Sequence, residues 1–279
     1  MVLLVDSGST KTIWKIISDN NIQTFYTKGL NPYIVSEREL KEAISSFSPL
    51  LGDYVKEIYF YGSGCGNNDI IDNKIRNPLK EIFPLAKIEI HNDLLACARG
   101  IFNKQEGLVC ILGTGSNATY YNGKECISSI PSLGYILGDE GSGSYIAKQL
   151  IKKYYYGQFS ETTLNQLKSL FPNTLSEILE NVYQKEMPNK YLGSFMNVFK
   201  EITDNKEIKH LILDAFNAFF EIYVVHYPEH LPIAFTGGVA FHFQEELYEV
   251  ANQFNRNIAE VVESPMEGLI KYHLDKIII

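Results

Sequence analysis

Val2-Leu3-Leu4-Val5-Asp6-Ser7-Gly8-Ser9-Thr10-Lys11-Thr12 begins with four apolar residues, the pattern of a strand buried on both faces. A second strand follows at once, Ile13–Ile17, with apolar residues at alternate positions. The stretch therefore predicts a β-hairpin with a tip rich in hydroxyl side chains. Gly8 lets the backbone of the tip approach a ligand closely, and successive N–H groups in such a turn form an anion-binding concavity. Asp6 ends the first strand, where a carboxylate can hold a hydrated Mg²⁺.

The hairpin differs from a P-loop. The Gly-x-x-x-x-Gly-Lys-Ser/Thr spacing is absent, and the glycine is followed by a strand where a P-loop has a helix. Taken alone, the stretch also fits an ordinary hairpin tip that happens to be rich in Ser and Thr.

A second stretch repeats the pattern. The apolar run Leu108–Leu112 leads into Gly113-Thr114-Gly115-Ser116-Asn117, and then into a further strand that ends at the turn Asn122-Gly123. A third glycine turn, Gly237-Gly238, follows the short apolar run Pro232–Phe235. The chain thus carries two phosphate-type hairpins and a late glycine turn.

This arrangement is typical of the actin–hexokinase–Hsp70 ATPase superfamily. Within it, the chain resembles the N-acetylglucosamine kinase and BadF/BadG/BcrA/BcrD-type ATPase family over essentially its whole length. The segments that carry the resemblance are Asp6–Thr12, Gly113–Asn117, Gly138–Gly143 and Thr236–Val239. The resemblance implies an α/β fold of two ribonuclease-H-like (actin-like ATPase) lobes with a cleft between them.

Strand and helix patterns agree with this fold. The order βββαβαβα is predicted for a first lobe over 1–106, in which Ser36 and Glu39 form a capping box at the first helix. A second lobe over 107–264 repeats the order more loosely and carries a helical insertion. Helices in that insertion are expected to break at Gly157, Pro172, Pro188 and Gly193. The resemblance implies that a last helix, within 265–279, returns to the first lobe.

Composition excludes several classes of function. The 279 residues carry a formal net charge of −8 without a basic block, which argues against nucleic-acid and anionic-membrane binding. No apolar run reaches membrane-spanning length, and no leader pattern precedes the first strand. The four cysteines lack Cys-x-x-Cys spacing, so reduced buried thiols and a cytoplasmic location are expected. The oligomeric state stays open, with a homodimer as one option.

The resemblance assigns roles to the hairpin residues. It implies that ATP and Mg²⁺ are bound, with Asp6 at the metal. The residues implied near the β- and γ-phosphates are Gly8, Ser9, Thr10, Lys11 and Thr12. Those implied to hold the nucleotide from the second lobe are Gly113, Thr114 and Gly115 at the phosphates and Gly237 and Gly238 at the adenosine. For Lys11, a solvated turn lysine is the alternative.

Asp93 is the candidate general base. It follows a predicted strand and opens a helix, and in the resembling sugar kinases an Asp at this point faces the sugar hydroxyl. The alternative is that Asp93 only caps its helix, which Asp does well. Asn31, Asn117 and Asp139 are the implied sugar partners, and amides suit hydroxyl and acetamido groups because they donate and accept. For Asp139, a carboxylate that stabilises a helix N-terminus is the alternative.

We therefore expect an ATP-dependent kinase of N-acetylglucosamine or a related amino sugar, whose lobes close on their ligands. One departure from the family keeps N-acetylmuramic acid and glucosamine open: Pro131-Ser132-Leu133 stands where mammalian-type kinases have Gly-Gly-Trp. A BadF-type ATPase that activates a partner enzyme is the first alternative, and its iron–sulfur cluster would need Cys65 and Cys97. A non-catalytic sugar sensor is the second, which the intact Asp6, Asp93 and Asp139 disfavour.

Overall fold

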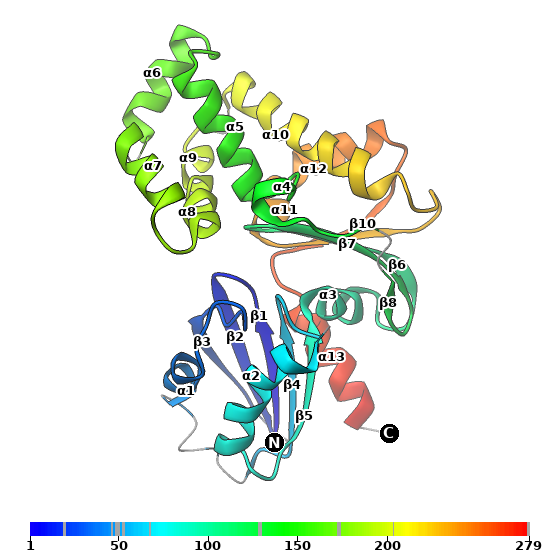
Figure 1. The fold of residues 1–279 in the computed structure, drawn as a ribbon. Coiled ribbons are helices and arrows are strands. Elements are labelled where there is room, and N and C mark those ends of the chain that lie inside the picture. The colour runs from blue at the N-terminus through cyan, green and yellow to red at the C-terminus, as the bar shows by residue number, and fades with distance from the viewer. Residues whose placement is uncertain are drawn as a thin grey trace. The chain divides into compact units, whose positions relative to one another are not determined.

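The computed structural model describes residues 1–18, 21–45, 47, 51, 54–66, 68–127, 130–171, 174–202 and 204–277. The chain forms two compact units (Figure 1). The first unit comprises Met1–Asn103 and Pro265–Ile279, and the second comprises Lys104–Ser264. Within the described ranges, no helix combines the length and apolar character that crossing a bilayer requires.

The first unit is built on a five-stranded sheet with the order β3-β2-β1-β4-β5. Its strands are β1 (Val2–Ser7), β2 (Lys11–Ser18), β3 (Asn21–Lys28), β4 (Glu57–Gly62) and β5 (Lys87–Asn92). β1, β2 and β3 pair antiparallel, whereas β4 pairs parallel with β1 and β5 parallel with β4. The apolar run of β1 explains its central place, because Leu3, Leu4 and Val5 are all fully buried.

Helices cover both faces of this sheet. They are α1 (Glu37–Ser45), α2 (Asp69–Ile82), α3 (Asp93–Phe102) and α13 (Met266–Ile277). α1 and α2 pack with Leu3 and Val5 on one face, and α3 and α13 pack with Leu4 on the other. The predicted order βββαβαβα is confirmed, as is the capping box of α1, in which the backbone N–H of Ser36 donates to Glu39 (2.9 Å).

The second unit repeats the sheet. Its order, β8-β7-β6-β9-β10, matches that of the first sheet strand for strand. The strands are β6 (Glu106–Leu112), β7 (Ser116–Asn122), β8 (Cys126–Ile127), β9 (Ile233–Thr236) and β10 (Ile258–Val262). Both predicted hairpins are thus the first strand pairs of two equivalent sheets. β8 is the shortest of these strands, and residues 128–129, which follow it, lie outside the described residues.

Helices of the second unit bury a large apolar core against its sheet. They are α4 (Gly134–Leu137), α5 (Gly143–Tyr155), α6 (Glu161–Leu170), α7 (Leu175–Tyr183), α8 (Pro188–Ser194), α9 (Met196–Lys200), α10 (Lys206–Phe219), the π-helical turn η3 (Phe220–Val224), α11 (Gly238–His242) and α12 (Gln244–Gln253). Pro188 begins α8, and α8 ends at Ser194, directly after the break predicted at Gly193, so both predictions are confirmed. Gly193 packs on Thr114, where a Cβ would come within 3.3 Å of the threonine methyl. Pro172 lies outside the described residues.

Candidate active site

The tip of the first hairpin is closed by backbone and by two buried hydroxyl groups. Gly8 N–H donates to the Lys11 carbonyl (3.0 Å). Thr12 Oγ1 donates to the Lys28 carbonyl (2.9 Å) and lies 2.8 Å from Ser7 Oγ, which therefore donates to it. Thr12 is fully buried. Its hydroxyl stabilises the hairpin from inside.

Other tip residues reach the surface, partly or fully: Ser9, Thr10 and Lys11. The Lys11 ammonium lies 4.3 Å from the centre of the Tyr26 ring, a cation–π contact on the exposed side of the sheet. The chain after β3 packs against the tip: a Cβ at Gly29 would lie 2.4 Å from the Gly8 carbonyl oxygen. Backbone of the first unit therefore supports the tip.

The carboxyl edge of the first sheet collects the predicted carboxylates. β1, β4 and β5 are parallel, so their carboxyl ends lie at one edge. Asp6 is the penultimate residue of β1 and is partly buried. Asp93 directly follows β5 as the first residue of α3.

Asn92, and not Asp93, caps α3. The Asn92 side-chain oxygen accepts a hydrogen bond from Leu95 N–H (2.8 Å). The Asp93 carboxylate accepts from its neighbour Leu94 N–H (3.0 Å) and is hydrogen-bonded by the Ser63 hydroxyl. Burial raises the pKa of Asp93 above the usual range, although these hydrogen bonds oppose the shift. The Asp93 carboxyl group is thus held at the start of α3 but is not needed as the cap of that helix.

The loop after β4, Gly62–Gly66, joins the predicted base to a predicted sugar partner. Ser63 N–H donates to the Ser7 carbonyl (2.9 Å), which ties the loop to the end of β1. Asn31 lies against the same loop, since a Cβ at Gly64 would come within 3.0 Å of its side-chain oxygen. Sequence reasoning missed Ser63. The signal was a Gly-Ser-Gly run that follows a strand at the same sheet edge.

In the second unit, Asp139 lies against the tip of the second hairpin. A Cβ at Gly115 would come within 2.8 Å of Asp139 Oδ2. The carboxylate accepts from Ser116 N–H and from the Ser132 hydroxyl (3.3 Å), and burial raises its pKa. Its backbone takes the left-handed conformation (φ 60°), which is uncommon outside glycine. Ser142 caps α5, so Asp139 is not the cap of that helix.

The Gly237-Gly238 turn packs on the same hairpin. Gly237 has φ 112°, and a Cβ there would lie 2.4 Å from the Leu112 carbonyl oxygen, so only glycine fits. Gly143 N–H donates to the Gly113 carbonyl (2.8 Å), which brings the start of α5 to this place too. A Cβ at Gly238 would meet open space. The predicted nucleotide residues of the second unit therefore gather around one exposed glycine surface.

No family model matches the chain. The crystal structure of a provisionally assigned N-acetylglucosamine kinase from Porphyromonas gingivalis is 35% identical in sequence, covers 99% of both chains and superposes with a TM-score of 0.91. The chain belongs to the N-acetylglucosamine kinase family. Membership makes it a sugar kinase, as the sequence predicts.

One further relative agrees with this assignment, and a more distant structure shares the fold. An N-acetylmuramic acid/N-acetylglucosamine kinase from Clostridium acetobutylicum is 27% identical over 210 residues, which are 71% of this chain and 69% of the relative. A ROK hexokinase from Thermus thermophilus, 14% identical with a TM-score of 0.55 over 99% of both chains, shares the fold. The predicted actin-like ATPase fold is therefore confirmed.

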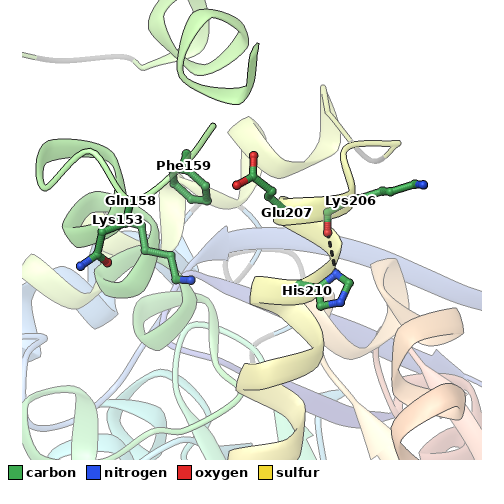
Figure 2. Close-up of a pocket in the computed structure, with 6 residues that line it drawn as sticks. All are labelled: Lys153, Gln158, Phe159, Lys206, Glu207 and His210. Carbon is green, nitrogen blue, oxygen red and sulfur yellow. Dashed lines mark hydrogen bonds between the residues drawn. The ribbon is translucent and has the colours of Figure 1, made fainter. Parts of the chain in front are cut away.

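A cavity elsewhere in the second unit is separate from the predicted site residues. It has a volume of about 250 Å³ and is open to the surface near α5 and α10 (Figure 2). Its lining residues are Lys153, Gln158, Phe159, Lys206, Glu207 and His210. Glu207 is already bonded by the hydroxyls of Ser160 (2.5 Å) and Thr163. None of the lining residues is one that the sequence assigns to the nucleotide or the sugar.

Asp6 could be the one protein ligand of a magnesium ion whose other ligands are water molecules and substrate phosphates. Among the described residues, no group of three or more His, Cys, Asp or Glu side chains is placed to hold a metal. Mg²⁺ in kinase sites keeps several waters and is commonly held by one or two carboxylates together with substrate phosphates. A single partly buried carboxylate at the end of β1 meets that requirement.

Proposed function

We propose that the protein transfers the terminal phosphoryl group of ATP to a hydroxyl group of N-acetylglucosamine or a related amino sugar. The environment of Asp93 carries the proposal: a carboxyl group of raised pKa at the carboxyl edge of the sheet, beside a helix that Asn92 already caps. The relatives named as N-acetylglucosamine and N-acetylmuramic acid kinases support the choice of an amino sugar.

Asp93 acts as the general base. Its carboxylate accepts the proton of the attacking sugar hydroxyl while that oxygen bonds to the terminal phosphorus of ATP. The bond between this phosphorus and the bridging oxygen breaks, and ADP leaves. A pKa raised by burial favours this step, because a base is most effective when its pKa approaches the working pH. Ser63 orients the carboxylate through its hydrogen bond, so Ser63 is a positioning residue.

Asn31, Asn117 and Asp139 are the proposed sugar partners. Amides can donate and accept, whereas the Asp139 carboxylate accepts from hydroxyl groups. Beside Asp139 lies an exposed apolar segment: Leu133, Ile136 and Leu137 are 58%, 71% and 73% exposed. Ser132, which bonds Asp139, immediately precedes this segment. Such a surface suits the alkyl part of an N-acyl substituent, so an N-acylated sugar is favoured over the free amine.

Glycine-rich backbone is proposed to hold the nucleotide. Gly8, Ser9, Thr10 and Lys11 lie at one tip, Gly113, Thr114 and Gly115 at the other, and Gly237 and Gly238 in the late turn. At Gly113 and Gly238 a Cβ would meet open space. A ligand can therefore lie directly on the backbone at these two residues. Asp6 would hold Mg²⁺ through water. When bound, the ion neutralises charge on the transferring phosphoryl group.

A screen of sugars for ADP release tests the proposal. We expect turnover with an N-acylated amino sugar, slower turnover with glucosamine and none without sugar. Hydrolysis of ATP that no sugar stimulates would overturn the proposal and favour a partner-activating ATPase. That alternative is disfavoured because Cys65 and Cys97 are both fully buried. Sugar binding without turnover would favour a sensor.

A further inference from the structure

A buried polar cluster in the first unit joins α13 to the strand and the helix that hold Asp93. The Tyr61 hydroxyl accepts a hydrogen bond from Arg99 Nη1 (2.8 Å) and lies 2.9 Å from His273 Nε2. Tyr61 is on β4, Arg99 is in the last turn of α3, and His273 is on α13. Tyr61 and His273 are 0% and 1% exposed, so water does not compete for these bonds.

The direction of one of these hydrogen bonds follows from the chemistry of its donor. Arg99 can only donate, so the Tyr61 oxygen accepts from it. The other hydrogen bond joins the Tyr61 hydroxyl to His273 Nε2, and its direction depends on the histidine tautomer. Burial raises the pKa of Tyr61 to about 12, which keeps the hydroxyl proton in place.

Packing closes the cluster on its remaining sides. The Tyr59 ring lies 4.0 Å, centre to centre, from the His273 ring, and the Arg99 guanidinium lies 5.2 Å from the centre of the Tyr272 ring. α3 and α13 also meet through glycine backbone, because a Cβ at Gly268 would come within 1.7 Å of the Gly100 carbonyl oxygen. The joint between the two helices and the strand is therefore close and directional.

Two paths lead from this joint to the proposed base, one through a hydrogen bond and one along a helix. Tyr61 lies two residues before Ser63, whose hydroxyl bonds the Asp93 carboxylate. Arg99 lies on the helix that Asp93 begins. We propose that the buried cluster of Arg99, Tyr61 and His273, called the relay below, is a positioning device that holds Asp93 in place for proton transfer. This inference rests on the proposed kinase function.

Side-chain variants separate positioning from packing. Tyr61→Phe keeps the buried ring and removes only the hydroxyl. His273→Leu removes the hydrogen-bonding partner of Tyr61, whereas His273→Gln places an amide, which can donate and accept, near the position of Nε2. Tyr59→Phe is the matched control: Tyr59 is on the same strand and touches the same histidine, but its hydroxyl donates to Glu57 (2.7 Å), outside the relay.

Steady-state kinetics of the full chain then test the relay. A misplacement of about 1 Å in an active site can lower a rate about 100-fold. We expect Tyr61→Phe and His273→Leu to lower kcat about tenfold with both KM values within about twofold. We expect His273→Gln and Tyr59→Phe to keep kcat within about twofold. If Tyr61→Phe keeps the wild-type kcat, or if Tyr59→Phe loses as much, the relay is not a positioning device.

Hydrogen exchange supplies a readout that does not need turnover. In Tyr61→Phe, amide exchange should quicken in Gly62–Gly66 and in the first turn of α3, and Tyr59→Phe should leave both unchanged. If the wild type has no sugar-dependent turnover, the proposed function fails, and exchange alone decides on the relay. Unchanged exchange in Tyr61→Phe would overturn it even if the kinase is active.

Discussion

Asn92 and Asp93 are adjacent, and the structure gives them different tasks that two substitutions can separate. In Asp93→Asn the side-chain oxygen can still accept from Leu94 N–H and from the Ser63 hydroxyl, and the Asn92 cap remains. What is lost is the ability to hold a proton from the sugar hydroxyl. Loss of a general base lowers kcat by about 10² to 10⁴, which corresponds to about 3 to 5 kcal/mol of transition-state stabilisation.

The stability of Asp93→Asn should stay close to that of the wild type. A carboxylate in the first turn of a helix contributes about 0.3 to 1 kcal/mol through the helix dipole. Burial of the same charge lowers the stability of the folded protein, which agrees with the raised pKa of Asp93. Because the two contributions oppose each other, we expect the free energy of unfolding to change by less than about 1 kcal/mol.

Asn92→Ala is the matched control. It removes the hydrogen bond to Leu95 N–H, and loss of such a cap costs about 1 kcal/mol of stability. The base is untouched, so kcat should stay within a few-fold of the wild type. ADP release at saturating sugar and ATP gives kcat, and urea unfolding at the same pH gives stability.

Opposite responses of the two variants are the critical result. Asp93→Asn should lose turnover and keep stability, whereas Asn92→Ala should lose stability and keep turnover. If Asp93→Asn turns over like the wild type, or if it loses stability while Asn92→Ala does not, Asp93 is a structural residue and the assignment of the base is wrong.

Three further results are expected. Because burial raises the pKa of Asp93, the folded protein keeps this proton where the unfolded chain has lost it. As pH rises from the usual aspartate range to the raised pKa, the unfolding free energy of the wild type should fall relative to that of Asp93→Asn. Over the same range, kcat/KM of the wild type should rise. Parallel curves of unfolding free energy against pH for the two proteins would contradict this. Gly237→Ala should unfold the turn, since its Cβ would lie 2.4 Å from the Leu112 carbonyl, whereas Gly238→Ala should fold normally and raise the KM for ATP; equal melting temperatures of the two variants would refute it. Asp6→Ala should abolish the response of turnover to added Mg²⁺, and a normal Mg²⁺ titration would exclude Asp6 as the metal residue.

Local patterns in the sequence determined the architecture. The run Val2–Val5 favours a central strand, because it has no polar face. The glycine tips after Asp6 and after Leu112 mark equivalent hairpins, and those hairpins define two equivalent sheets. Gly237 also follows from local chemistry, since its positive φ excludes side chains. Even the burial of Thr12 was available in the sequence, since alternation places it on the same face as the buried Trp14.

Only the tertiary structure decided how the candidate site is held. The sequence could not choose between Asn92 and Asp93 as the cap of α3, because both side chains accept hydrogen bonds and the choice depends on backbone angles. Ser63 contacts Asp93, and Ser132 contacts Asp139, from separate loops. The spacing of residues along the sequence does not predict such pairs. Tyr61 and His273 are 212 residues apart in the chain. Their hydrogen bond exists only because α13 packs on the sheet of the first unit, and that packing is a property of the assembled core.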